Sequence, residues 1–258
     1  MADGSERSAP VRGAAVRPGV LAPPCYRRRV VIVVDDGRAQ AGVEDDYHHF
    51  RMSMAHDGRH VTVVEGEAVR FPWATCPGAS AMLRSLVGTP IETAVVRHPD
   101  AFDRFNQCTH QLELALLAIA QVARGASRCF DVTITGTDAG RMRVATVERD
   151  GVLVEEWRLA GDELLAPPNL AGVNVRKLRP WANTLDDDRY EGVAILRRCL
   201  QVSSRGSRTV LPQVASHVPG SRNACYAFQD VRAELGRFVP ESPRDFSDSP
   251  DELLREFR

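Results

Sequence analysis

Residues 108–125 read CTHQLELALLAIAQVARG, and this stretch decides the fold class that the sequence predicts. Leu112, Leu116 and Ile119 recur at the spacing of one helix face, and further leucines and alanines widen the apolar stripe. Gly125 follows the last periodic residues, which is typical of a helix C-terminus. We therefore predict a long helix over this range, with a broad buried face.

The chain before this helix carries short β-branched or alternating apolar runs that end in turns containing glycine. Such a pattern is typical of an antiparallel meander. A shorter helix is expected where Pro77 takes the first helical position after Cys76, and it ends at Gly88. The predicted strands span residues 29–34, 47–55, 60–64 and 67–73.

The chain after the long helix carries a second β region. Asp150 and Gly151 separate two apolar runs, which is a strong hairpin signal. Acidic residues at 186–188 indicate the start of a helix that runs to about Val202. The predicted strands span residues 129–135, 142–149 and 152–159, and a last short helix covers residues 225–235.

The predicted fold class is α+β: an antiparallel β-meander followed by helices, then a second β-rich lobe with C-terminal helices. A disordered leader rich in Pro, Gly, Ala and Arg is expected over residues 1–26, and a flexible tail over residues 239–258. The first lobe spans residues 27–125 and the second spans residues 126–238. Because the connection at 125–127 is too short for a free linker, we expect the two lobes to share one core.

The composition excludes several classes of protein. The 258 residues carry 33 Lys+Arg against 34 Asp+Glu, and this near-neutral balance gives no global attraction to nucleic acid or membrane surfaces. The only lysine, Lys177, lies in a polar, Pro-flanked stretch, and the sequence has no phosphate-binding P-loop motif. No apolar run reaches the length of a membrane span, and no secretory signal precedes the six dispersed cysteines. We therefore expect a cytoplasmic protein with reduced thiols.

Two cysteines, Cys76 and Cys108, stand at predicted helix N-termini. The partial positive charge there is expected to lower a thiol's pKa and so favour the thiolate that attacks electrophiles or binds metals. His110 follows Cys108 within the same first turn. The catalytic candidates are Cys76, Cys108, His110 and His48. The opposing interpretation is that these cysteines are small buried hydrophobes, as we expect of Cys225.

The run EDDYHH at residues 44–49 brings acids and imidazoles to the start of a predicted strand. Strand alternation puts His48 and His49 on opposite faces, and Asp46 on the same face as His48. Asp46 and His48 are therefore the better predicted pair. The alternative is that Asp46 is a surface acid in a charged run.

The candidates for substrate binding are two arginines and one tryptophan. Arg70 and Arg141 are candidates to hold a carboxylate, because bidentate guanidinium recognition is the cationic option left in a chain with one lysine. Trp73 is the aromatic candidate to line the same groove.

Several of these stretches resemble the bacterial domain-of-unknown-function family 2889. The resemblance covers roughly residues 25–230 and implies no particular reaction, because the activity of that family is unsettled. The matching stretches are EDDYHHF at 44–50, RFPWATC at 70–76, CTH at 108–110, ERDG at 148–151, and the region of Trp181 and residues 186–198.

Residues 46–124 are also similar in plan to U-type iron–sulfur scaffold proteins, in which three antiparallel strands precede two helices that each begin at a cysteine. The similarity implies ligand positions at Cys76, Cys108 and the Asp46 region. The first cysteine of the scaffold has no counterpart here, where acids and His48 stand instead. The resemblance therefore implies a mixed site of Asp46, His48, Cys76 and Cys108, which suits tetrahedral zinc better than an iron–sulfur cluster.

Three hypotheses follow for the function. The first is a small-molecule enzyme, a hydrolase or lyase acting on an acyl or aromatic compound, with or without zinc. The second is a non-catalytic carrier of metal, an iron–sulfur cluster or sulfur. The third is an interaction protein whose cysteines are structural. The first implies a small-molecule substrate, and none implies nucleic acid or membrane. The substrate and the oligomeric state stay open.

Overall fold

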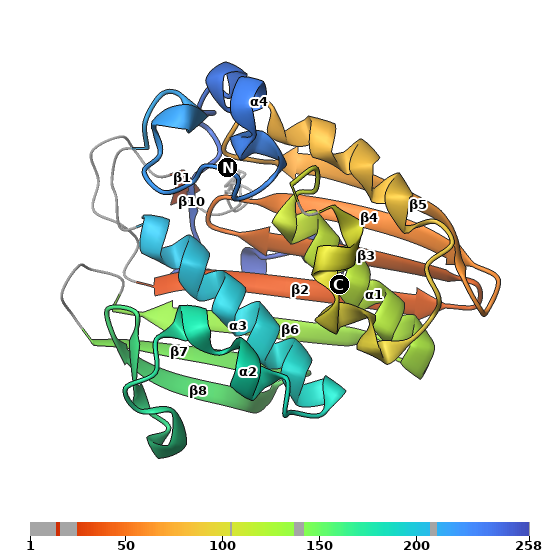
Figure 1. The fold of residues 1–258 in the computed structure, drawn as a ribbon, viewed down its shortest axis with the longest axis horizontal. Helices are drawn as coiled ribbons and strands as arrows, with labels where there is room; N and C mark the ends of the chain where they lie inside the picture. Colours follow the sequence, from red (N-terminus) through yellow and green to blue (C-terminus); the bar gives the residue numbers. More distant parts are fainter. Residues whose placement is uncertain (1–13, 16–24, 104, 137–141, 207–210, 258) are drawn as a thin grey trace, which may run out of the picture.

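The computed structural model describes residues 14–15, 25–103, 105–136, 142–206 and 211–257 (Figure 1). An eight-stranded antiparallel sheet forms its centre, in the order β5-β4-β3-β2-β6-β7-β8-β9. The predicted α+β class is confirmed. The strands are β2 (Cys25–Asp35), β3 (Arg38–Asp45), β4 (His49–His56), β5 (Val61–Arg70), β6 (Arg128–Thr135), β7 (Met142–Arg149), β8 (Val152–Ala160) and β9 (Glu163–Ala166).

Two long helices lie on the same face of this sheet (Figure 1). Helix α1 packs on β2, β3 and β4, whereas α3 packs on β6, β7 and β8. Within the described ranges, no helix is both long enough and apolar enough to cross a membrane. The α-helices are α1 (Thr109–Arg124), α2 (Arg179–Ala182), α3 (Asp187–Gly206) and α4 (Asp230–Leu235).

Short elements complete the fold. A two-stranded sheet pairs β1 with β10. The 3-10 helices are η1 (Cys76–Leu86), η2 (Thr93–Arg97), η3 (Pro99–Phe102), η4 (Pro168–Leu170), η5 (Val175–Lys177), η6 (Ala215–His217), η7 (Tyr226–Phe228), η8 (Pro250–Glu252) and η9 (Arg255–Phe257), and the short strands are β1 (Ala14–Ala15) and β10 (Arg244–Asp245).

The strands from both predicted lobes form one continuous sheet. Strand β2 pairs with β3 on one side and with β6 on the other. One apolar cluster extends from Phe50 on β4 and Leu116 on α1 to Val147 on β7 and Ile195 on α3. The boundary predicted after residue 125 therefore falls in a connection between two parts of one core.

Strand β3 is the main element that the sequence pattern did not predict. Its sequence RAQAGVED has few β-branched residues, yet it pairs along its whole length with β2 and β4. Alanine and glycine are buried there because α1 and the C-terminal segment approach the strand closely. By contrast, β5 is one strand, where two had been expected.

The hairpin between β7 and β8 has the geometry that its sequence predicts. Asp150 and Gly151 both have positive φ, at 52° and 79°. Two consecutive residues of this kind form a type I′ turn, whose twist matches that of the flanking strands.

The C-terminal residues cover the other face of β2–β4. Phe246, Leu253 and Leu254 are buried, although the sequence led us to expect a flexible tail there. A Cβ atom on Gly42 would lie 2.6 Å from the ring of Phe257, so glycine allows this close approach. Of the expected disordered leader, residues 1–13 and 16–24 lie outside the described residues.

Candidate functional site

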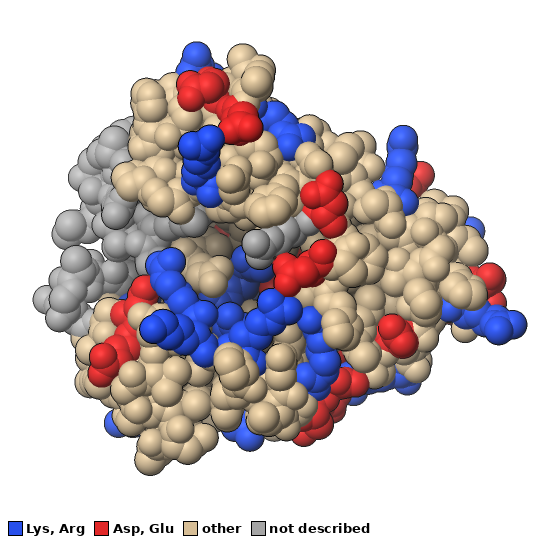
Figure 2. Space-filling view, viewed as in Figure 1, with Lys and Arg blue, Asp and Glu red and all other residues tan. Residues whose placement is uncertain are grey.

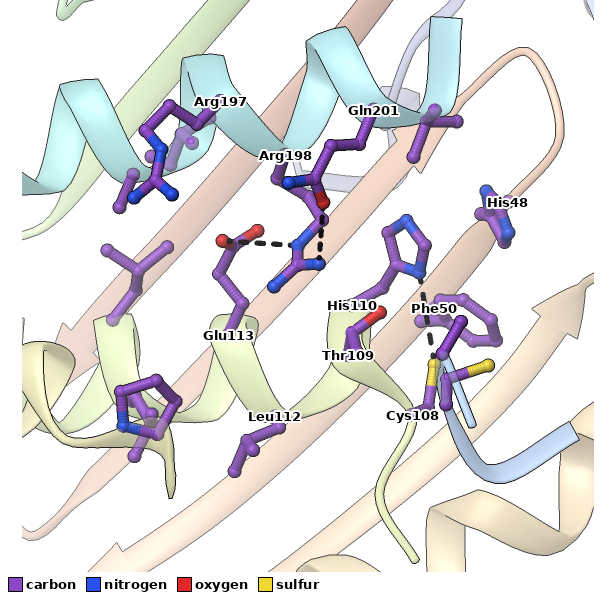
Figure 3. Close-up of a pocket in the computed structure, with 18 of the residues that line it drawn as sticks. His48, Phe50, Cys108, Thr109, His110, Leu112, Glu113, Arg197, Arg198 and Gln201 are labelled. Atoms are coloured by element: carbon purple, nitrogen blue, oxygen red, sulfur yellow. Dashed lines mark hydrogen bonds and ion pairs between the residues drawn. The ribbon is translucent and has the colours of Figure 1, made fainter. Parts of the chain in front are cut away.

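A cavity of about 500 Å³ lies between α1, α3 and the turn that joins β3 to β4 (Figure 3). The sequence-predicted candidates that line it are His48, Trp73, Cys76, Cys108 and His110. Apolar side chains from both helices form much of the remaining wall. The structure therefore brings together residues that are more than 60 positions apart in the sequence.

Strand alternation points Asp45 toward this cavity. Ala41 and Val43 on β3 are buried under α1, and Asp45 is the next residue on the same face. The chain then turns through residues 46–48, and the backbone N–H of His48 donates to Asp45 Oδ1 at 2.8 Å. The acid that pairs with His48 is thus Asp45. The sequence had favoured Asp46, since it treated this turn as part of a strand.

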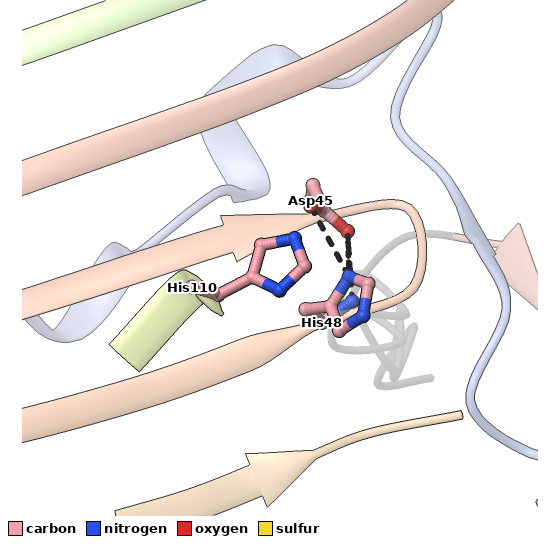
Figure 4. A group of neighbouring side chains, drawn as sticks. All are labelled: Asp45, His48 and His110. Atoms are coloured by element: carbon pink, nitrogen blue, oxygen red, sulfur yellow. Dashed lines mark hydrogen bonds and ion pairs between the residues drawn. The ribbon is translucent and has the colours of Figure 1, made fainter. Parts of the chain in front are cut away.

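The carboxylate of Asp45 accepts hydrogen bonds on both oxygens (Figure 4). Oδ2 accepts the Tyr26 hydroxyl at 2.8 Å and the Arg28 guanidinium at 2.6 Å. Oδ1 accepts the backbone N–H groups of Tyr47 and His48 and lies 3.0 Å from His48 Nδ1. Burial raises the pKa of Asp45, but the charges of His48 and Arg28 outweigh it and hold that pKa well below its usual range.

His48 is positioned as an imidazole with one nitrogen committed and one available. Its Nδ1 faces Asp45, and no described residue hydrogen-bonds its Nε2. The side chain is 12% exposed, at the cavity wall. A carboxylate that fixes Nδ1–H leaves Nε2 as the basic nitrogen, which is the arrangement of an oriented general base.

His110 extends the site from the first turn of α1. Its ring stacks on that of His48 with 4.1 Å between centroids, and its Nδ1 lies 4.0 Å from Cys108 Sγ (Figure 3). Burial, then the charges of His48 and Arg28, lower the pKa of His110 well below its ordinary value. His110 is therefore a neutral imidazole at neutral pH.

Three thiols line the same cavity: Cys76, Cys108 and Cys225. Cys108 is the N-cap of α1, as the sequence indicated. Cys76 is the first residue of η1 and Thr75 is its N-cap, so the sequence placed the start of this helix one residue too late. The expected lowering of thiol pKa was wrong. Burial, with a contribution from Cys225, raises the pKa of Cys108 to about 12 and that of Cys76 well above its ordinary value. Desolvation of a thiolate outweighs the helix terminus here.

Three other predicted residues do not line the cavity among the described residues. The Arg70 guanidinium donates to the backbone carbonyls of Asp46 at 3.0 Å, His48 at 3.2 Å and Ser242 at 2.6 Å, so it stabilises the turn. The Asp46 carboxyl is buried near Asp245, away from His48. Arg141 lies outside the described residues.

The donor atoms fit a directly bound metal ion poorly. Asp45, His48 and His110 each offer one ligand atom within 4.8 Å of the others. However, each Asp45 oxygen already accepts several hydrogen bonds. Two of those on Oδ2 come from the buried Arg28 guanidinium. In the described part of the chain, Cys76 and Cys108 join no group of three potential ligands at this spacing. We therefore derive no step through a metal.

Sequence reasoning missed four residues of the site: Asp45, Arg197, Arg198 and Cys225. For Asp45, the signal was an Asp three residues before a His, which is typical of a side chain that caps a tight turn. For Arg197 and Arg198, the signal was two adjacent charges inside an otherwise apolar helical stretch. Cys225 carried no such signal.

Comparison with known families assigns part of the chain. A family model described as "Protein of unknown function (DUF2889)" matches residues 31–124, so this segment is similar to that family. The segment is shorter than the resemblance over residues 25–230, but it contains Asp45, His48, Cys76 and Cys108. No curated protein sequence matches the chain.

Proposed function

We propose that this protein is a small-molecule hydrolase that acts on an acyl compound, with His48 as general base and Asp45 as its positioning residue. The observation that carries the proposal is the Asp45–His48 pair, whose Nδ1 contact of 3.0 Å leaves Nε2 without a hydrogen-bond partner among the described residues. His48 lines a cavity large enough for a small ligand, and Asp45 is buried behind it.

The proposed step needs only groups of this chain, water and the acyl substrate. His48 Nε2 takes a proton from water while the water oxygen bonds to the carbonyl carbon, which gives a tetrahedral oxyanion. Collapse of that oxyanion breaks the bond to the leaving group, and His48 returns the proton to it. Asp45 stabilises the transient imidazolium through Nδ1–H.

Cys108 offers a second attacking group for the same reaction. Its thiol is neutral at rest because its pKa is about 12, so deprotonation must accompany attack. His110 Nδ1 at 4.0 Å is a potential acceptor of that proton. A covalent route would form an acyl–cysteine intermediate, whereas a water route would not.

The test is a screen of nitrophenyl esters and thioesters of small acids with the full chain. We expect His48→Gln to lower kcat/KM by about 10²- to 10⁴-fold. The control is His60→Gln, because His60 is exposed at the far end of the sheet and should not affect the rate.

Two outcomes would count against this proposal. Wild-type protein that turns over no ester or thioester contradicts hydrolysis of acyl compounds, and an unchanged rate in His48→Gln contradicts the assigned base. Cys108→Ser distinguishes the two routes, since only the covalent route requires the thiol. An acyl adduct on Cys108, measured by mass spectrometry, would identify that route.

A second candidate function is a non-catalytic metal carrier. It is supported by the spacing of the Asp45, His48 and His110 ligand atoms, and it is disfavoured by the occupied oxygens of Asp45. Metal analysis and absorption spectra of protein purified without oxygen test it. A brown protein would favour an iron–sulfur carrier. Metal-free wild-type protein would overturn it.

A further inference from the structure

We propose that Arg197, assisted by the neighbouring Arg198, binds the carboxylate of a small organic acid inside the cavity. The inference rests on the proposed function and deepens it, because the carboxylate would belong to the substrate or product of that site. The acid would carry one negative charge and an apolar acyl or aromatic body.

Among the described residues, four arginines line the cavity, and three of them have partners within the protein. The Arg97 Nε lies 2.7 Å from Asp187, and an Arg179 nitrogen lies 3.0 Å from Asp100. Arg198 is 3.7 Å from Glu113 and donates to Gln201 at 3.3 Å (Figure 3). Glu191, a further acid on the cavity wall, lies 2.6 Å from Arg124.

Arg197 differs from these three arginines. No described residue forms a hydrogen bond or ion pair with its guanidinium, and its Nε is buried without an acceptor. It extends from α3 toward α1, as Arg198 does (Figure 3). Burial lowers the pKa of Arg197, and the charge of Arg198 adds to that effect. An unpaired, partly desolvated cation of this kind is unfavourable in the empty protein, and an anion would compensate it.

The chemistry of the wall selects a carboxylate. A guanidinium binds a carboxylate with two parallel hydrogen bonds, and one unpaired arginine matches one negative charge. A phosphate dianion would need a second cation without a partner, whereas Arg198 already shares its charge with Glu113. Leu112, Leu116 and Ile195 line the same cavity and suit an apolar body.

Basic side chains on the surface near the cavity would attract such an anion. Figure 2 shows basic side chains gathered along one edge of a hollow, with acidic side chains at another edge, on the face that carries α1 and α3 in Figure 1. Local positive charge at a cleft raises the encounter rate with anions, even in a chain whose net charge is near zero.

Isothermal titration with three probes tests the inference: benzoate, its neutral analogue benzamide, and inorganic phosphate. We expect benzoate to bind the full chain more tightly than either of the others. Arg197→Gln should weaken benzoate binding by about 10- to 100-fold, the usual effect of losing a charge-assisted pair. Arg158→Gln is the matched control, because Arg158 is exposed on β8 and is not among the residues that line the cavity.

One further variant and one further measurement separate loss of binding from loss of folding. Arg197→Lys retains the charge without the two-pronged geometry, so we expect an intermediate loss of affinity. The melting temperature of ligand-free Arg197→Gln should not fall, because the arginine forms no hydrogen bond or ion pair with a described residue. Folding therefore should not confuse the result.

Equal benzoate affinity in wild type and Arg197→Gln would overturn the inference, as would absence of benzoate binding or tighter binding of phosphate. Failure of the proposed function is distinguishable from these results. His48→Gln should still bind benzoate, and a wild-type protein that binds benzoate but hydrolyses no ester would contradict only the hydrolase proposal.

Discussion

The turn between β3 and β4 carries two acid–histidine pairs, one on each face of the sheet. Asp45 and His48 lie on the face that carries α1, where Asp45 Oδ1 is 3.0 Å from His48 Nδ1. Glu44 and His49 lie on the face covered by the C-terminal segment. There His49 Nδ1 is 3.6 Å from Glu44, and His49 Nε2 is 2.7 Å from Glu256.

The two pairs differ in whether the histidine has a ring nitrogen available to a ligand. His49 lines a second hollow of about 340 Å³, but both of its ring nitrogens contact carboxylates and its side chain is only 1% exposed. His48 uses one nitrogen and presents the other at a larger cavity. A hollow and an acid–histidine pair are therefore insufficient for acid–base chemistry, which needs an uncommitted nitrogen.

The largest effect on stability is expected from Asp45→Asn, which removes the 2.6 Å partner of the fully buried Arg28 and leaves it Glu113 at 4.0 Å. A buried charge left without its partner costs about 3–5 kcal/mol in the free energy of unfolding. Glu44→Gln on the other face should cost about 1–3 kcal/mol, because Arg70 keeps several carbonyl acceptors. Urea denaturation of both variants measures the difference.

The pH dependence provides a control for this comparison. Asp45 has a lowered pKa in the folded protein. Its contribution to folding stability is therefore fully present above the unfolded pKa of about 3.9 and is lost as pH falls through the folded pKa. Asp45→Asn should therefore lose part of the acid destabilisation seen in wild type. An equal loss in the free energy of unfolding for Asp45→Asn and Glu44→Gln would show that the two acids contribute equally to stability.

The two histidines should separate stability from activity. His49→Gln removes contacts to two carboxylates and should cost about 1–3 kcal/mol, with the catalytic rate unchanged. His48→Gln should cost about 1 kcal/mol or less, because Asp45 keeps its other donors, while the rate falls. A rate loss in His49→Gln that matches that of His48→Gln would contradict this separation.

Asp46, between the two pairs, should have the opposite pH dependence to Asp45. Burial raises the pKa of Asp46 well above its usual range, and the charges of Asp45 and Asp245 add to the rise. The folded protein thus holds a proton that the unfolded chain releases above about pH 4, so this group lowers stability as pH rises.

Asp46→Asn should therefore be more stable than wild type. The advantage should grow by up to about 1.4 kcal/mol per pH unit from about pH 4 to the folded pKa. Thermal or urea unfolding at several pH values measures it. An advantage that shrinks as pH rises would indicate that Asp46 is ionised in the folded protein.

The smallest effect is expected at Lys177. It lies in η5, away from both pairs and outside the cavity lining. Lys177→Arg should change neither the rate nor the stability by more than about 0.5 kcal/mol, as is usual for surface substitutions. A large loss of activity would mean that the site assigned to His48 is wrong.

Local sequence patterns predicted most of the elements but not how they assemble. The helix over residues 109–124, the hairpin at Asp150 and the strands on either side of it follow from periodicity and turn chemistry. Strand β3 was missed because its buried residues Ala39, Ala41 and Gly42 carry little β propensity. Its place in the sheet depends on pairing with β2 and β4, and no local sequence pattern signals that pairing.

The candidate site was predicted in part. The sequence pointed to His48, Cys108 and His110, which the structure brings to one cavity. It favoured Asp46 over Asp45 as the acid that pairs with His48. The choice between these two neighbours depends on where the strand ends and the turn begins, which the sequence pattern did not show. Alternation turns such a shift of one residue into a change of face.

The sequence by itself determined the α+β class, the helix that begins after Cys108, and the concentration of acids and imidazoles at residues 44–49. Only the tertiary structure decided which acid meets which histidine, that burial keeps the thiols neutral, and that Arg197 has no described partner. Periodicity and turn chemistry act between near neighbours in the chain, whereas desolvation and charge pairing depend on groups that folding alone brings together.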